Sequence, residues 1–134
     1  FGSGFMFALT HDLRVMREDR DSLCANEMQL GLPIPRPELA LFRHKIPANA
    51  FFETVQLSKR WTGRDALHAG IVQELSSFDE ITAVVQRKAE ELAPLANNRK
   101  NYGHQKEMLF GERAAINQID GPAHMLKHSE DFNA

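Results

Sequence analysis

The start of the chain alternates short apolar runs with turns. Residues 4–11 (GFMFALTH) are apolar on nearly every side and follow a Gly-Ser-Gly turn, which predicts a short buried helix with a glycine-rich N-terminus. In residues 13–18 (LRVMRE) apolar side chains alternate with arginines, as in a strand with one solvated face. After a turn at residues 19–21, residues 22–25 (SLCA) are a second candidate for a short strand.

Prolines set the boundaries of the next section. Pro33 and Pro35 stiffen a loop, and a helix (PELALFRHKI) begins at Pro37 and ends before Pro47. Proline is tolerated in the first turn of a helix but not in its interior, which is why it marks both boundaries. Residues 48–58 (ANAFFETVQLS) form an amphipathic segment directly after this helix.

A short helix with a recognisable start and end follows. Thr62 and Asp65 have the spacing of a capping box, with aspartate in place of the usual glutamate or glutamine. Gly70 is placed to end this helix. Residues 71–75 (IVQEL) then predict another short strand.

The second half of the chain has a helical pattern. Between residues 78 and 96 apolar side chains recur every three or four residues, which predicts a long helix with a charged outer face; they are Ile81, Val84, Val85, Ala89 and Leu92. Pro94 is expected to kink or end the last turn of this helix. A further helix is expected over residues 99–119, with its stop at Gly121-Pro122.

The predicted fold is therefore mainly helical, with a few short strands near its start. Taken alone, these strands are too few for a stable sheet. The chain opens at Phe1 directly before a predicted helix, without an initiator methionine or the basic region of a signal peptide. We therefore expect sequence upstream of Phe1 that supplies partners for the strands at residues 13–18 and 22–25.

Composition limits the classes of function. A length of 134 residues allows one domain with a real core, and 43% hydrophobic with 25% charged residues is ordinary for a globular protein. The formal net charge of −2 gives no support to a nucleic-acid or anionic-membrane surface. No apolar run approaches the ~20 residues of a membrane-spanning helix. A single cysteine, Cys24, excludes an internal disulfide and is expected to be an inert buried thiol.

One carboxylate is isolated in residues 22–35 (SLCANEMQLGLPIP). Glu27 is the one charged residue of this stretch, and a turn residue that faces water is the simplest explanation for it. The side chains that follow it are largely apolar and include Met28, Leu30, Leu32 and Pro33.

The Gly-Ser-Gly turn has more than one explanation. A serine nucleophile of the G-x-S-x-G type is excluded, because Phe1 and Phe5 occupy the positions that need glycine. Ser3 could be a plain N-cap of the following helix. Alternatively, the unpaired backbone N–H groups at this helix start favour a negative charge, such as a developing oxyanion.

Other polar clusters predict no site. His124 and His128 are four residues apart and could share a helix face, but no third ligand is spaced near them, so we expect no metal site. The basic residues between Arg87 and Lys106 are expected to form the solvated face of helices, although a nucleotide-bearing ligand could use one or two of them.

Together these features resemble the crotonase superfamily, which contains the enoyl-CoA hydratases and isomerases. Residues 2–35 (GSGFMFALTHDLRVMREDRDSLCANEMQLGLPIP) resemble that family's oxyanion turn, buried helix, strand and catalytic loop, in order. Residues 57–75 (LSKRWTGRDALHAGIVQEL) are similar to its segment after the active site. Residues 76–134 agree with the family's trimerising region only in being helical.

The resemblance implies a fold class and a domain organisation. The class is α/β, the C-terminal portion of a crotonase-like (ClpP/crotonase spiral) fold. Residues 1–75 would be the C-terminal part of the crotonase core, and residues 76–134 a C-terminal helical oligomerisation region. The N-terminal half of the same subunit would precede Phe1.

The resemblance also implies roles for individual residues. Glu27 falls where the family places a catalytic glutamate that faces the acyl chain, and Ser3 falls where a backbone N–H completes the oxyanion hole. Met6 stands where hydratases carry a second glutamate. Met6, Leu30 and Pro33 are the expected acyl-pocket residues.

The methionine at position 6 decides between reactions. Hydration of an enoyl thioester needs two carboxylates, whereas moving a double bond from the 3 to the 2 position needs one base. Residues 26–31 (NEMQLG) are also similar to the isomerase branch. The implied function is a 3-enoyl-CoA to 2-enoyl-CoA isomerase, with a coenzyme A thioester as substrate and neither a further cofactor nor a metal.

Two alternatives stay open. Another crotonase member, such as an enoyl-CoA hydratase, a thioester hydrolase or a decarboxylase, would share the oxyanion platform. A non-catalytic helical oligomerisation module would need Glu27 only as a turn residue. The implied partners are an acyl-CoA and further copies of the subunit in a homotrimer or dimer of trimers, with neither nucleic acid nor a membrane. Acyl chain length and compartment are left open.

Overall fold

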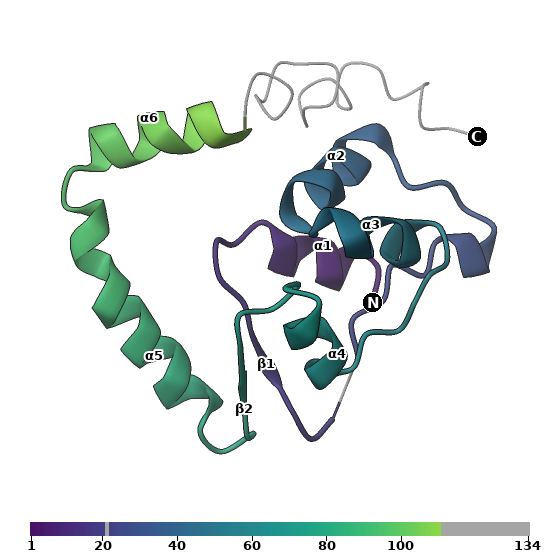
Figure 1. Ribbon diagram of the computed structural model, residues 1–134, viewed down its shortest axis with the longest axis horizontal. Coiled ribbons are helices and arrows are strands. Elements are labelled where there is room, and N and C mark those ends of the chain that lie inside the picture. Colours follow the sequence, from purple (N-terminus) through teal and green to yellow (C-terminus); the bar gives the residue numbers. More distant parts are fainter. Residues whose placement is uncertain (21, 111–134) are drawn as a thin grey trace.

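The computed structural model describes residues 1–20 and 22–110 of the chain. A group of short helices surrounds the core, two short strands run along one side of this group, and a bent helical arm lies beyond the strands (Figure 1). In chain order the elements are α1 (Ser3–Leu9), β1 (Val15–Arg17), the 3-10 turn η1 (Met28–Leu30), α2 (Arg36–Lys45), α3 (Ala48–Val55), α4 (Gly63–His68), β2 (Glu74–Ser76), α5 (Ile81–Leu92), the 3-10 turn η2 (Ala93–Ala96) and α6 (Arg99–Phe110).

Buried side chains of α1 and α2 meet at the centre of the core. Phe5 and Leu9 of α1 are fully buried, which confirms the predicted buried helix near the start of the chain. The ring of Phe5 meets the ring of Phe42 in α2 edge-on, with centroids 5.3 Å apart and planes at 83°. This is a preferred geometry for two aromatic rings, so the pair fixes the packing of α1 on α2.

The two strands form a parallel pair. Val15 of β1 lies opposite Glu74 of β2, and Arg17 lies opposite Ser76. The intervening helices α2, α3 and α4 form the long connection that parallel pairing requires. The expectation that the strand at residues 13–18 would pair outside this chain is wrong for this edge, because the chain returns to it through β2.

Two other predicted strands, at residues 22–25 and 71–75, differ from the structure. Residues 22–25 form an isolated antiparallel bridge between Leu23 and Trp61, not a strand. The strand predicted at residues 71–75 begins only at Glu74, because the N–H groups of Ile71 and Val72 both donate to the Ala66 carbonyl and complete the end of α4. The apolar pair Ile71-Val72 is buried in the core without strand pairing.

Gly63 is the point where α4 meets the sheet. A Cβ at this position would lie 2.8 Å from the carbonyl oxygen of Arg17 and 3.1 Å from Cδ2 of Leu75. Real Cβ atoms do not approach a backbone oxygen this closely, so a glycine is required for this packing. The predicted cap is confirmed, with Thr62 Oγ1 accepting the N–H of Asp65 at 3.2 Å.

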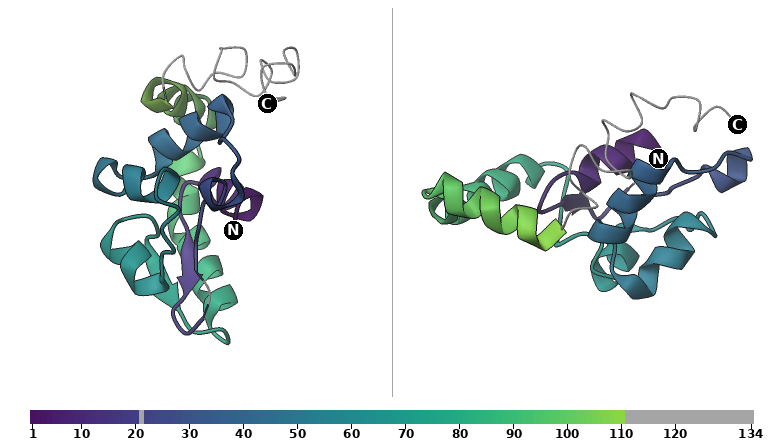
Figure 2. Two further views of the ribbon diagram at one scale, coloured as in Figure 1. Left: turned by 90° about the vertical axis from the view of Figure 1, so that its right-hand side faces the viewer. Right: turned by 90° about the horizontal axis from the view of Figure 1, so that it is seen from above.

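The helical arm consists of α5, η2 and α6. Figure 2 shows that it extends away from the helices around the core, with α5 alongside the strands. Pro94 lies in η2, which confirms that the predicted long helix ends near it. The helix predicted over residues 99–119 is seen as α6; its last part and the stop at Gly121-Pro122 lie outside the described residues.

Ion pairs attach the arm to the rest of the structure. Glu74 of β2 accepts Arg87 at 2.9 Å and Lys88 at 2.8 Å, both from α5. Lys106 of α6 donates to Asp12 at 2.8 Å, and this hydrogen bond is the main reason why the pKa of Asp12 is below its usual value. Within the described ranges, no helix is both long and apolar enough to cross a membrane.

Candidate functional site

Backbone hydrogen bonds within the loop hold the turn that carries Glu27. The carbonyl of Glu27 accepts the N–H groups of Leu30 and Leu32, each at 2.9 Å. Gly31 takes the left-handed conformation (φ 71°) that closes this tight turn. Figure 1 shows η1, in dark blue, projecting from the helices around the core.

The carboxylate of Glu27 points back toward the start of α1. Its Oε1 lies 3.5 Å from the position that a Cβ would occupy on Gly2. Gly2 has φ 47° and ψ −127°, a conformation that is essentially restricted to glycine. A residue without a side chain therefore leaves room for the carboxylate beside the helix N-terminus.

One oxygen of this carboxylate is buried without a partner. Oε2 of Glu27 has no hydrogen-bond partner in the described part of the chain. A buried carboxylate oxygen without a hydrogen bond costs free energy and calls for an explanation. Glu27 therefore lies at a turn, as that interpretation expects, but one oxygen of its carboxylate does not face water.

Ser3 contributes a backbone donor at the same place. Gly2 is the N-cap of α1 and Ser3 is the first helical residue, with no side-chain cap hydrogen bond, so the interpretation of Ser3 as an N-cap is wrong. The first N–H groups of a helix have no intrahelical acceptor, and within residues 1–20 and 22–110 that of Ser3 has none. A free donor and the carboxylate of Glu27 thus meet at one helix end.

The expected acyl-pocket residues lie in different surroundings. Met6 is buried in the core at 7% exposure, whereas Leu30 is 63% exposed and Pro33 is also exposed. Met28 and Leu32 are exposed as well, so the side chains that follow Glu27 do not cover it. An enclosed acyl pocket made by Met6, Leu30 and Pro33 stays a prediction.

Glu38 is a second carboxylate near the loop, and no sequence motif marks it. Glu38 lies half-buried in the first turn of α2. Burial, and after it the negative charge of Glu27, raises the pKa of Glu38 above its usual value. The sequence signal was ambiguous, because an acidic residue in the first turn of a helix is ordinarily explained by the helix dipole.

The structure shows the contacts of those remaining candidates that lie within the described residues. Cys24 is fully buried, as predicted, and burial raises the pKa of its thiol. Arg87 is exposed and pairs with Glu74, in agreement with a solvated helix face, whereas Lys88 pairs with the same carboxylate but is half-buried. Among the described side chains, no group of three metal-ligating residues is placed to hold a metal ion; His124 and His128 lie outside the described residues.

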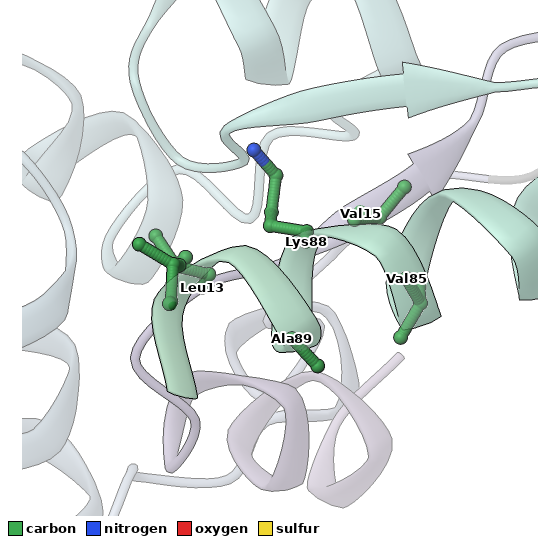
Figure 3. A pocket seen from close by; sticks show the side chains of 6 residues that line it. Leu13, Val15, Val85, Lys88 and Ala89 are labelled. Carbon is green, nitrogen blue, oxygen red and sulfur yellow. The ribbon is translucent and has the colours of Figure 1, made fainter. Parts of the chain in front are cut away.

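A cavity of about 180 Å³ lies between β1 and α5 (Figure 3). Its lining is apolar apart from one lysine, and consists of Leu13, Val15, Val85, Lys88, Ala89 and Leu92. The ammonium group of Lys88 is already paired with Glu74 at 2.8 Å. None of the lining residues belongs to the Glu27 loop or to α1, so this cavity is separate from the site.

Comparison with known proteins identifies the family. The family model described as enoyl-CoA hydratase/isomerase matches residues 1–130. The Arabidopsis thaliana protein named enoyl-CoA delta isomerase 3 is 34% identical over 114 residues, which cover 82% of this chain and 48% of that protein. Enoyl-CoA delta isomerase 2, peroxisomal, of the same plant is 33% identical over 117 residues, or 85% of this chain and 49% of that protein. The chain spans about half the length of the curated relatives it matches.

Solved structures confirm the predicted fold class. The human mitochondrial delta3-delta2-enoyl-CoA isomerase superposes with a TM-score of 0.75 at 18% identity, over 97% of this chain and 47% of that one. An enoyl-CoA hydratase/isomerase family protein from Pseudomonas syringae reaches a TM-score of 0.78 at 18% identity, over 98% and 54%. At such identities the likeness concerns the fold alone. With the family match over nearly its whole length and its isomerase-named relatives, the chain belongs to the enoyl-CoA hydratase/isomerase family of the crotonase superfamily, close to the isomerases.

Proposed function

We propose that the protein carrying this chain moves the double bond of an enoyl-CoA thioester from the 3 to the 2 position. The observation that carries the proposal is the buried Oε2 of Glu27, which has no hydrogen-bond partner among the described residues. A carboxylate held in this way is free to take a proton from a substrate carbon. The names of the two Arabidopsis thaliana relatives support the same reaction class.

The reaction needs one base that works twice. Glu27 takes a proton from C2, and the electron pair of that C–H bond moves toward the thioester oxygen to give a dienolate. When the dienolate takes up a proton at C4, that electron pair returns and forms the C2–C3 double bond in place of the C3–C4 double bond. The proton returned to C4 comes from the protonated Glu27, so atoms and charge balance without a further reactant. General acid–base catalysis by such a group contributes about 10²–10⁴-fold.

The intermediate of this reaction is a thioester enolate, whose oxygen carries negative charge. The free N–H of Ser3 is the donor that we assign to this oxygen from the described part of the chain. Donors that are fixed in place before the charge develops stabilise it effectively. By the family resemblance, a second N–H comes from residues upstream of Phe1.

The second candidate function is hydration, and Glu38 favours it. Hydratases need a second carboxylate, and Met6 does not provide one. Glu38 is half-buried and lies close enough to Glu27 for the charge of Glu27 to raise its pKa. A hydratase would use Glu38 as the second acid or base, whereas an isomerase has no step that needs it.

Spectrophotometric assays separate the two candidates. The protein expressed from its complete coding sequence is given 3-enoyl-CoA and, separately, 2-enoyl-CoA. We expect rapid isomerisation with slow hydration in the wild type, and isomerisation within about threefold of the wild-type rate in Glu38→Gln, because a residue outside the reaction leaves kcat nearly unchanged. Fast hydration that Glu38→Gln abolishes would replace the isomerase assignment by a hydratase.

A further inference from the structure

Ser58 has a backbone conformation that serine rarely adopts. Its φ of 48° is the one positive φ of a non-glycine residue within the described ranges, and the residue is 2% exposed. In this region the Cβ crowds the following carbonyl oxygen, which costs free energy. The buried Oγ of Ser58 also has no hydrogen-bond partner among the described residues. No hydrogen bond of the side chain therefore accounts for the conformation.

The backbone of Ser58 directs its carbonyl oxygen at the Glu27 loop. This oxygen accepts a hydrogen bond from Sγ of Cys24 at 3.2 Å and another from Nε2 of Gln29 at 3.3 Å. Cys24 and Gln29 lie on either side of Glu27 in the sequence. A single carbonyl oxygen thus holds both ends of the segment that carries the carboxylate.

The segment around Ser58 is itself anchored in the core. Trp61 and Leu23 exchange backbone hydrogen bonds of 2.9 and 3.0 Å. Nε1 of Trp61 donates to Oγ1 of Thr54 at 3.0 Å, and this hydroxyl donates to the carbonyl of Ala50 at 2.8 Å within α3. The hydrogen bond between Trp61 and α3 therefore holds the segment around Ser58, which in turn contacts the Glu27 loop.

Cys24 connects this support to the start of α1. Its carbonyl accepts the N–H of Gly2 at 3.0 Å, while its thiol donates to Ser58. Gly2 is also the residue beside Oε1 of Glu27. The contacts of Ser58 therefore fix both the loop and the helix end between which the carboxylate lies.

We propose that the Ser58 carbonyl and the Gln29 amide form a positioning clamp for the carboxylate of Glu27. The proposal rests on the proposed role of Glu27 as the base. Neither group needs to touch the substrate; the clamp holds the loop so that the carboxylate stays in reach of the carbon it deprotonates. A displacement of about 1 Å at a reacting group can lower a rate by about 100-fold.

The direct test is Gln29→Met, which keeps the length of the side chain and removes its donor. Gln86→Met is the matched control, because Gln86 also uses its Nε2, to bind Glu90 at 2.8 Å on the distant helix α5. We expect the isomerisation kcat of Gln29→Met to fall about 3- to 30-fold, with KM within about twofold of wild type. Gln86→Met should match the wild type in both constants.

A double-mutant cycle with Glu27→Gln distinguishes positioning from a merely structural role. If Gln29 acts through Glu27, the Gln29→Met change lowers kcat in the wild type but has no further effect in the Glu27→Gln background. An equal loss in both backgrounds, or no loss in either, would overturn the clamp.

Hydrogen exchange gives a readout that does not depend on activity. Amides of residues 24–30 should exchange faster in Gln29→Met than in the wild type and in Gln86→Met. Unchanged exchange in this segment would overturn the clamp even if activity could not be measured in Glu27→Gln. Wild-type isomerisation by Glu27→Gln would instead overturn the proposed function, and exchange would then decide about the clamp alone.

Discussion

In the described part of the chain, two buried side-chain oxygens have no hydrogen-bond partner: Oε2 of Glu27 and Oγ of Ser58. The two residues lie on opposite sides of the contact between the Glu27 loop and the Ser58 carbonyl. Glu27 lies in the loop that Ser58 holds through Cys24 and Gln29. Unsatisfied buried groups and strained backbone persist only where the surrounding structure enforces them, and they concentrate at functional sites. Their occurrence on both sides of this contact is consistent with a site that is held in place at some cost in stability.

Ser58→Gly tests that cost. Glycine adopts a positive φ freely, whereas an L-residue pays roughly 1–2 kcal/mol there; the greater freedom of glycine in the unfolded chain offsets about 0.4–1 kcal/mol of the gain. We expect the free energy of unfolding to rise by about 1 kcal/mol, measured by urea denaturation. Ser76→Gly is the control, because Ser76 is also buried but lies in β2, and this change should lower stability. A loss of stability in Ser58→Gly would show that its backbone is not strained.

The sequence identifies only some of the residues of the site. Glu27 can be identified as a candidate site residue because it is the one charged residue in residues 22–35. Ser3 can be identified because it lies in a glycine-rich turn before an apolar helix. Ser58 could not be identified from the sequence, since the residues that donate to its carbonyl lie about 30 positions away in the chain. The half-burial of Glu38 likewise depends on packing that no local pattern encodes.

The helices lie close to the positions predicted from the sequence, whereas the strands differ from the prediction. Pro37, Pro47 and Pro94 lie at helix boundaries, because proline is unfavourable in the interior of a helix. Strand pairing depends on partners distant in the sequence, so β1 could not be matched to β2 from the pattern alone. The segment at residues 22–25 has a strand-like composition but makes an isolated bridge.

The contact between α4 and the sheet depends on Gly63. In Gly63→Ala the new Cβ would lie 2.8 Å from the carbonyl oxygen of Arg17, so α4 or β1 must move. We expect the free energy of unfolding to fall by about 1–3 kcal/mol, as for other overpacked sites. Gly4→Ala in α1 is the matched control, because nothing lies within 4 Å of its added Cβ. Equal stability of the two variants in thermal denaturation would contradict the close approach of α4 to the sheet.

For the whole molecule, we propose that the chain assembles as a homotrimer or a dimer of trimers, with the arm at the interface. Exposed apolar side chains on the arm support this; they are Val85, Leu95, Met108 and Leu109, at 47 to 69% exposure. Ion pairs hold the arm against the rest of the structure, but α5 itself has no buried residue. The division of the chain at residue 75 stays a prediction, since it falls within β2.

Light scattering on the protein expressed from its complete coding sequence tests this assembly. We expect the mass of three or six subunits, with more than about 1,000 Å² buried per pair of chains. Leu95→Asp and Met108→Asp, which place a charge on the exposed apolar surface of the arm, should lower the mass toward that of one subunit. A stable wild-type monomer would contradict the proposed interface.

Glu27→Gln separates the role of Glu27 as the base from every other role of this side chain. Glutamine keeps the shape of the side chain but cannot accept a proton from C2. We expect kcat for 3-enoyl-CoA isomerisation to fall by about 10²–10⁴-fold, with acyl-CoA affinity and melting temperature nearly unchanged. The exposed Glu18 supplies the control, and Glu18→Gln should keep the wild-type rate. Isomerisation by Glu27→Gln at the wild-type rate would assign the base to another residue.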